Sequence, residues 1–387
     1  MIAIYRKYRP KKLEDVLGQE TLVQILKNAA KTDRLAHAYL FSGPRGSGKT
    51  TTARLIAKIA NCQKRQSDEK FKQVGEPCNE CQACTEIDSG IAMDVIEIDA
   101  ASNRGIDEIR DLKEGIRLSP SSYAYKVFII DEVHQLTKEA FNALLKTLEE
   151  PPKHAIIILA TTEFEKVPAT ISSRTQRFNF KKVTLREIAD KLETICKLEK
   201  IAHSKEALEL IAEAAEGSFR DAESLLDQLR PLNNADLTHA VGGAGAESRG
   251  KISVEDVEKT IGRVGFSRVS ELADFLLKNE LEKSLAYLNK INEEGYNITQ
   301  FNKDLIQYFR KVLALKFAPI LEKDFRQILT DSEVNKLKEH SQLVGAAAGQ
   351  QKVINLVKSL IRAYTEMRYS PFAIVPLEVA IIENLKS

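Results

Sequence analysis

The segment that most constrains the fold is Gly43–Thr50, with the sequence GPRGSGKT. It matches the pattern G-x-x-x-x-G-K-[ST] at every fixed position, between a strand-like run and a helix-like stretch. Glycines let backbone N–H groups curl around phosphate oxygens, and the following helix turns its positive end toward them. We expect Lys49 to reach the β- and γ-phosphates of a nucleotide and the Thr50 hydroxyl to ligate Mg²⁺. A chance glycine-rich turn is the alternative. The predicted phosphate-binding residues are Gly43, Pro44, Arg45, Gly46, Ser47, Gly48, Lys49, Thr50 and Thr51.

Apolar runs of strand length alternate with helix-like stretches in the first half of the chain. Such alternation is typical of a mostly parallel sheet that helices cover on both faces. The middle runs are rich in β-branched residues, as buried strands are. The sequence therefore predicts an α/β domain with a five-stranded parallel sheet over residues 1–180. The five runs are 38–43, 94–99, 125–132, 154–162 and 175–180.

The remainder of the chain is predicted to be helical. Thr184 and Glu187 form a capping-box pattern, and further helices are expected from Ala207 and near Arg220. A glycine-rich stretch then precedes a helix start at Ser253. These observations predict a three-helix domain, a linker and a helical C-terminal domain. Their bounds are 181–240, 241–252 and 253–387.

A nucleotide site of this kind needs acidic and polar groups beside the phosphates. The buried run KVFIIDE ends in Asp131, expected to hold Mg²⁺, and Glu132, expected to accept a proton from water. Thr161 and Thr162 end the next run, where strand ends line the ligand crevice, so a hydroxyl there can sense the γ-phosphate. Alternatives are a solvated acidic pair and threonines that bind a loop backbone. His134 is expected to orient the loop.

Four of the five cysteines lie within residues 62–84. Two C-x-x-C steps share Cys81, and such short spacings let thiolates converge on one tetrahedral ion. Because four thiolates leave no open position for water, we predict a structural zinc ion in a module of about residues 61–93. An iron–sulfur cluster and free thiols are the alternatives. The predicted ligands are Cys62, Cys78, Cys81 and Cys84, whereas Cys196 is expected to be a buried apolar residue.

Charge and hydropathy exclude two classes of protein. Lys plus Arg (57) nearly balances Asp plus Glu (55), so a globally basic nucleic-acid coat is excluded, although a local basic face is not. The N-terminus lacks the apolar run of a signal peptide, and no stretch approaches the roughly 20 apolar residues of a membrane span. We therefore expect a cytoplasmic protein.

An ordered set of segments resembles a known family. The segments RKYRPKKLEDVLGQE, GPRGSGKT, IIDEVH, FNALLKTLEEPP, LATTE, SSRTQRF and GSFRDA are similar to those of the bacterial clamp-loader ATPases, the DNA polymerase III gamma/tau subunits of the AAA+ class. The likeness is dense over residues 4–230 and thinner beyond. It implies an AAA+ sheet, a three-helix lid and a C-terminal helical collar that joins subunits. Simple core packing is the alternative for the collar.

The resemblance also implies roles for particular residues. Thr162 would be the first sensor of the γ-phosphate, and Arg220 the second, reaching from the lid. Arg174 would be an arginine finger that acts on ATP held by the neighbouring subunit, which makes hydrolysis depend on assembly. The family motif is usually Ser-Arg-Cys, but Thr175 follows Arg174 here, and a surface ion pair is the alternative for Arg174. The residues implied beside the adenine and phosphates are Arg9, Pro10 and Val16.

The resemblance further implies cofactors and partners. The cofactors are ATP, Mg²⁺ and structural Zn²⁺, and the activity is ATP hydrolysis that loads a sliding clamp during DNA replication. The partners are the delta, delta-prime and further gamma/tau subunits, the beta clamp, and primer–template DNA bound without sequence preference at the replication fork. Arg104 would contact DNA phosphate, unless its helix is simply an amphipathic surface helix. Other functional classes are a hexameric motor, such as a Holliday-junction helicase, and a scaffold with a silent ATPase.

Overall fold

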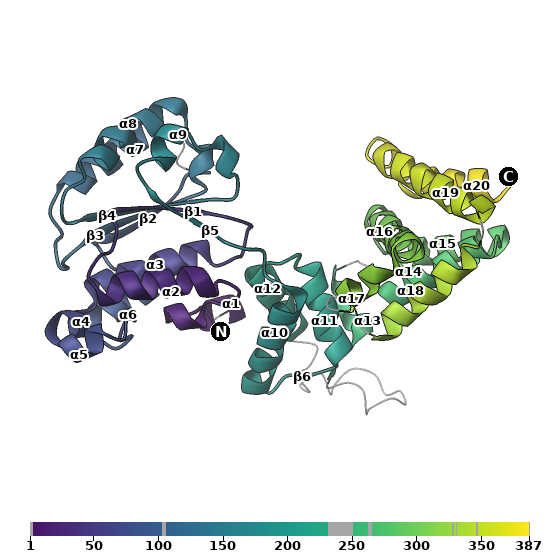
Figure 1. The fold of residues 1–387 in the computed structure, drawn as a ribbon, viewed down its shortest axis with the longest axis horizontal. Coiled ribbons are helices and arrows are strands. Elements are labelled where there is room, and N and C mark those ends of the chain that lie inside the picture. The colour runs from purple at the N-terminus through teal and green to yellow at the C-terminus, as the bar shows by residue number, and fades with distance from the viewer. Residues whose placement is uncertain are drawn as a thin grey trace, which may run out of the picture. The chain divides into compact units, whose positions relative to one another are not determined.

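The chain folds into two compact units, and the first of them contains the five-stranded sheet. A computed structural model describes residues 3–102, 106–230, 251–261, 265–326, 329, 331–345 and 347–386. The first unit comprises Met1–Lys197 and Ala215–Asp227, and the second comprises Leu198–Ala214 and Gln228–Ser387 (Figure 1). Arg104 and most of the predicted linker lie outside the described residues.

The first unit contains the predicted five-stranded parallel sheet. Its strand order is β2-β3-β4-β1-β5, and every neighbouring pair is parallel. Ser42 pairs with Thr161 and Asp99 with Asp131, so polar strand ends gather at one edge. The strands are β1 (Ala38–Ser42), β2 (Val95–Asp99), β3 (Lys126–Asp131), β4 (Ala155–Thr161) and β5 (Gln176–Asn179). The prediction from the apolar runs is confirmed.

Helices cover both faces of this sheet (Figure 1). Alternate side chains of β3 point to opposite faces: Val127 packs with the core under α2 and α3, and Phe128 with the core under α7 and α8. Both faces are apolar, which explains the continuous hydrophobic runs. The helical segments before the lid are α1 (Ile4–Lys7), η1 (Leu13–Asp15), α2 (Glu20–Lys31), α3 (Lys49–Asn61), α4 (Gln63–Ser67), α5 (Glu69–Lys72), α6 (Gln82–Ser89), α7 (Ile106–Arg117), η2 (Val133–Gln135), α8 (Lys138–Glu149), η3 (Phe164–Lys166) and α9 (Ala169–Ser172).

The segment after the sheet is helical, as predicted. Thr184 and Glu187 form the expected capping box, because Glu187 N–H donates to Thr184 Oγ1 at 3.2 Å and Thr184 N–H donates to Glu187 Oε2 at 2.8 Å. Ser253 and Asp256 make the same reciprocal pair. The elements here are α10 (Leu185–Glu199), β6 (Ala202–His203), α11 (Lys205–Ala214), α12 (Phe219–Leu229), β7 (Lys251–Ile252) and α13 (Val254–Ile261), with β6 and β7 paired in parallel.

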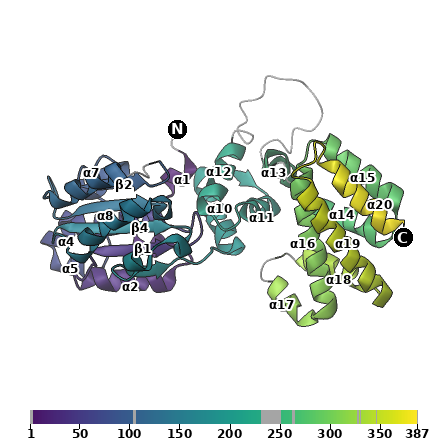
Figure 2. The ribbon, with the colours of Figure 1, turned by 90° about the horizontal axis from the view of Figure 1, so that it is seen from above.

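The C-terminal helices share one apolar core. α16 lies beside α18 and α19 (Figure 2). The Phe301, Leu305 and Phe309 side chains of α16 are buried in this core. The helical segments are α14 (Phe266–Leu277), α15 (Leu281–Glu293), α16 (Ile298–Phe317), η6 (Pro319–Leu321), α17 (Glu322–Phe325), α18 (Asp331–Leu343), α19 (Ala347–Glu366) and α20 (Ile374–Leu385). The predicted helical C-terminal domain is confirmed. Among the described residues, no helix combines the length and apolar character that a membrane crossing requires.

Candidate nucleotide and metal sites

The phosphate-binding loop connects the end of β1 to the start of α3. Gly46 and Gly48 have φ angles of 72° and 100°, a conformation that glycine adopts without strain. A Cβ atom on Gly46 would lie 2.0 Å from Ser218 Oγ, so the loop packs directly against the residue before α12. This close approach explains a glycine at a position that the general motif leaves free.

Lys49 lies in the curve of this loop. Its side chain is almost fully buried, and Nζ donates hydrogen bonds to the carbonyl oxygens of Gly43 at 2.8 Å and Pro44 at 2.7 Å. Burial lowers the pKa of Lys49, while the nearby carboxylates of Asp131 and Glu132 act in the opposite direction. The ammonium group is therefore placed between the loop and the acidic strand end.

The predicted magnesium ligands meet at the same edge of the sheet. Thr50 Oγ1 donates to Asp131 Oδ2 at 2.8 Å, although the two residues are far apart in the sequence. Glu132 follows Asp131 with a φ of 48°, and this turn directs its carboxylate toward the end of β4. There Glu132 Oε2 accepts a hydrogen bond from Thr162 Oγ1 at 2.9 Å. One hydroxyl and one carboxylate can thus share a hard cation, and a second carboxylate lies beside them.

His134 connects the ends of β3 and β4. Its ring is buried, with Nδ1 3.0 Å from Thr161 Oγ1 and 3.4 Å from Glu132 Oε2. On the other side, Nε2 is 3.1 Å from Glu163 Oε1. These contacts join His134 to the ends of both strands, and its role as an orienting residue stays a prediction.

Arg174 lies beside α9 and is held by an acidic residue of α8. Its Nε and Nη2 are 2.9 Å and 2.7 Å from Glu149 Oε1, and Nη1 donates to the Thr170 carbonyl at 2.9 Å. Within one chain, Arg174 therefore forms the surface ion pair that the sequence left open as an alternative. The sequence motifs did not identify Glu149, although the acidic pair in LEEPP was a visible signal.

Positive side chains gather where α12 meets the N-terminal segment. The Arg220 guanidinium lies 5.3 Å from the centre of the Tyr5 ring, a contact that the sequence did not predict. Burial lowers the pKa of Arg9, and the positive charges of Arg54 and Arg220 lower it further. Pro10 is half-buried beside Arg9. The charge of Arg220 therefore acts on Arg9, and the roles implied for both residues at a nucleotide stay predictions.

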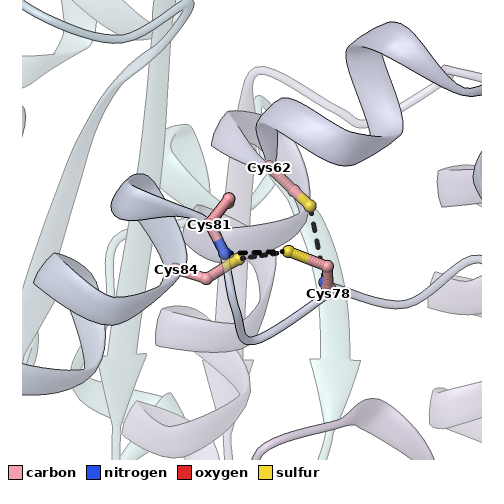
Figure 3. Close-up of side chains that lie close together, drawn as sticks. All are labelled: Cys62, Cys78, Cys81 and Cys84. Atoms are coloured by element: carbon pink, nitrogen blue, oxygen red, sulfur yellow. Dashed lines mark hydrogen bonds between the residues drawn. The ribbon is translucent and has the colours of Figure 1, made fainter.

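The four clustered cysteines converge on one point (Figure 3). Their sulfur atoms all lie within 4.8 Å of one another, and Cys78 Sγ is 3.9 Å from Cys84 Sγ. Zinc–sulfur bonds of about 2.3 Å in a tetrahedron require sulfur separations of about 3.8 Å, which this arrangement approaches. Backbone N–H groups of Glu80 and Cys81 donate to Cys78 Sγ at 3.4 Å and 3.2 Å, which favours the thiolate.

The protonation of this cluster also suits a cation. A hydrogen bond from Cys84 lowers the pKa of Cys62 to about 4, while the same bond and burial raise the pKa of Cys84. Zn²⁺ would supply the positive charge that a cluster of thiolates requires, and its binding would release their protons. The donor set fits Zn²⁺. Cys196 is buried apart from this cluster, and burial raises its pKa to about 12.

Three family models match the chain in succession. Residues 18–184 match a model described as DNA polymerase III, delta subunit. Residues 187–229 match the DNA polymerase III clamp loader subunit, ATPase lid domain. Residues 252–386 match the DNA polymerase III subunits gamma and tau domain III.

Curated relatives extend over nearly the whole chain. DNA polymerase III subunit tau of Bacillus subtilis is 41% identical over 98% of this chain and 62% of its own length. The gamma/tau subunit of Mycoplasma genitalium is 36% identical over 99% of this chain and 62% of its own length. Subunit gamma of Buchnera aphidicola subsp. Schizaphis graminum is 34% identical over 98% of this chain and 97% of its own length. The chain belongs to the DNA polymerase III gamma/tau subunit family.

Membership of the gamma/tau family confirms the resemblance seen in the sequence. The chain spans about three fifths of the length of the Bacillus and Mycoplasma relatives. The structure brings together the phosphate loop, the acidic end of β3 and the end of β4. The roles of the individual residues stay predictions.

Proposed function

We propose that the chain is the ATP-hydrolysing motor subunit of a bacterial replicative clamp loader. The observation that carries this proposal is the convergence of Lys49, Thr50, Asp131 and Glu132 at one sheet edge in a gamma/tau family chain. Lys49 and the loop N–H groups bind the phosphates, and Thr50 and Asp131 hold Mg²⁺, which neutralises phosphate charge. Glu132 accepts a proton from the attacking water.

The remaining polar residues complete the site in this proposal. Thr162, which already hydrogen-bonds Glu132, detects the γ-phosphate. Arg220 approaches the same nucleotide from the lid, and Arg9, Pro10 and Val16 lie beside the adenine and the phosphates. Arg174 supplies positive charge to ATP held by a neighbouring subunit, since Glu149 fixes its guanidinium at the chain's surface. Hydrolysis then requires assembly.

The assembly carries out mechanical work. ATP binding arranges this chain with the delta, delta-prime and further gamma/tau subunits so that the complex opens the beta clamp. Primer–template DNA triggers hydrolysis, and the closed clamp is released. Residues 1–180, 181–240 and 253–387 serve as nucleotide-binding, lid and collar domains, and Zn²⁺ on the four cysteines has a structural role.

Binding of the sliding clamp tests this proposal. In an assembled loader with the other subunits, the wild-type chain should retain the clamp only with ATP present. Lys49→Ala should abolish this ATP-dependent retention, because the triphosphate loses its buried cation. The exposed Lys153→Ala is the matched control. Retention of the clamp that is the same with and without ATP, and the same in Lys49→Ala as in the wild type, would contradict the proposed function.

A further inference from the structure

The cysteine module, residues 62–89, contacts the N-terminal segment through a buried carboxylate. Glu76 is 2% exposed, and its two oxygens accept hydrogen bonds from the backbone N–H groups of Leu13 at 2.7 Å and Glu14 at 3.1 Å. Lys27 of α2 lies 2.9 Å from the same carboxylate. Leu13 is fully buried, so water cannot replace this acceptor.

The N–H groups that Glu76 holds belong to the segment that leads to the nucleotide pocket. They begin η1, and Val16 follows it directly. Val16 is buried, and its Cγ1 atom lies 3.6 Å from the position of a Cβ on Gly48. Gly48 caps α3 next to Lys49. A displacement of η1 would therefore change the contact between Val16 and the phosphate loop.

The same module also contacts the other end of α3, the helix that follows the phosphate loop. Cys62 follows the last residue of α3. One turn earlier, the fully buried Lys58 donates to Asp88 Oδ1 of α6 at 2.7 Å. Arg65 donates to the carbonyl oxygens of Ile59 at 3.2 Å and Ala30 at 2.8 Å, which ties the module to α3 and α2. The module therefore contacts both the pocket's N-terminal wall and its phosphate-binding helix.

We propose that the cysteine module is a brace for the nucleotide pocket, in which Glu76 is the positioning residue that holds Leu13–Val16 beside the phosphate loop. This inference rests on the proposed nucleotide site. Zinc bound to the four cysteines maintains the fold of the module. The folded module keeps the Glu76 carboxylate in contact with the N–H groups at the start of η1. The metal centre then acts on nucleotide affinity at a distance, without touching the nucleotide.

The test compares Glu76→Gln with Glu80→Gln in the assembled, zinc-loaded complex. The two N–H groups each bind a different oxygen of the Glu76 carboxylate, and Glu76→Gln leaves only one acceptor oxygen for both. The Glu80 side chain is exposed in the same module, so Glu80→Gln is the matched control. We expect Glu76→Gln to raise the Kd for ATP about tenfold, since a charge-assisted hydrogen bond is worth about an order of magnitude. The kcat at saturating ATP and the zinc content should not change. Hydrogen exchange at Leu13 and Glu14 should accelerate, and Glu80→Gln should resemble the wild type.

The outcomes separate the brace from the proposed function. Unchanged ATP affinity in a folded Glu76→Gln chain, or unchanged exchange at residues 13–14, would overturn the brace. If that variant does not fold, removal of zinc from the wild type by a chelator replaces it: faster exchange at residues 13–16 and weaker ATP binding support the brace, and unchanged values overturn it. A wild-type chain that binds no ATP would overturn the proposed function instead. The exchange data would still test the contact between Glu76 and residues 13–14.

Discussion

Replacing Glu132 by glutamine should leave ATP bound but not hydrolysed. An amide has the shape of the carboxylate and can still accept the hydrogen bond from Thr162, but it cannot take a proton from water. Because a general base contributes about 10²–10⁴-fold, we expect kcat to fall by that factor while the Kd for ATP stays the same. Single-turnover hydrolysis and equilibrium nucleotide binding in the assembled loader measure the two quantities.

Glu165→Gln is the matched control for this variant. Glu165 is exposed a few residues beyond the end of β4, so its substitution removes the same charge without touching the acidic strand end. We expect wild-type hydrolysis from it. If Glu132→Gln hydrolysed ATP at the wild-type rate, Glu132 would not be the base, and the chemistry proposed for the end of β3 would be wrong.

Removing one ligand of the cysteine cluster should destabilise the sheet unit strongly. Cys84→Ala leaves three thiols for a tetrahedral ion and opens the core between α3 and α6. We expect Tm to fall by about 10 °C or more, because a structural zinc site contributes several kcal/mol of folding free energy. Scanning calorimetry gives the Tm, and metal analysis of the purified chain should show lost zinc.

Cys196→Ala distinguishes the loss of a metal ligand from the loss of an ordinary buried cysteine. Cys196 is as buried as Cys84 but belongs to α10 and lies outside the cluster. Its truncation should cost about 1 kcal/mol, a few degrees of Tm, and should leave the zinc content intact. Equal losses of Tm in both variants, with no zinc in the wild type, would show that the cluster is not a structural metal site.

Local patterns were sufficient to predict much of the architecture. The central strands β1, β3 and β4 follow from apolar runs whose length and composition suit burial on both faces. The helix starts at Thr184 and Ser253 follow from capping residues three positions apart, and both caps form. The phosphate loop and the acidic end of β3 are brief, contiguous signals. Each of these features depends on neighbours in the sequence, which is why they could be predicted.

Contacts between distant segments could not be predicted in this way. Glu76 holds Leu13 across 63 positions, and Glu149 holds Arg174 across 25 positions. Lys191 of α10 pairs with the buried Glu223 of α12, again with no local signal. A charged residue in a sequence looks the same whether it is solvated or buried against a partner. Only the fold distinguishes them, and the positioning roles proposed here depend on that distinction.

In the proposed mechanism, a neighbour's Arg174 completes the site that hydrolyses ATP. The most direct measurement is steady-state ATP hydrolysis by the reconstituted loader, with primed DNA and clamp present, for Arg174→Ala and for the exposed control Arg186→Ala. We predict that Arg174→Ala lowers the stimulated rate by about 10³-fold with unchanged ATP binding, as loss of an arginine finger does, and that Arg186→Ala has no effect. Full stimulation of the Arg174→Ala assembly by clamp and primed DNA would show that Arg174 does not act on a neighbour's ATP.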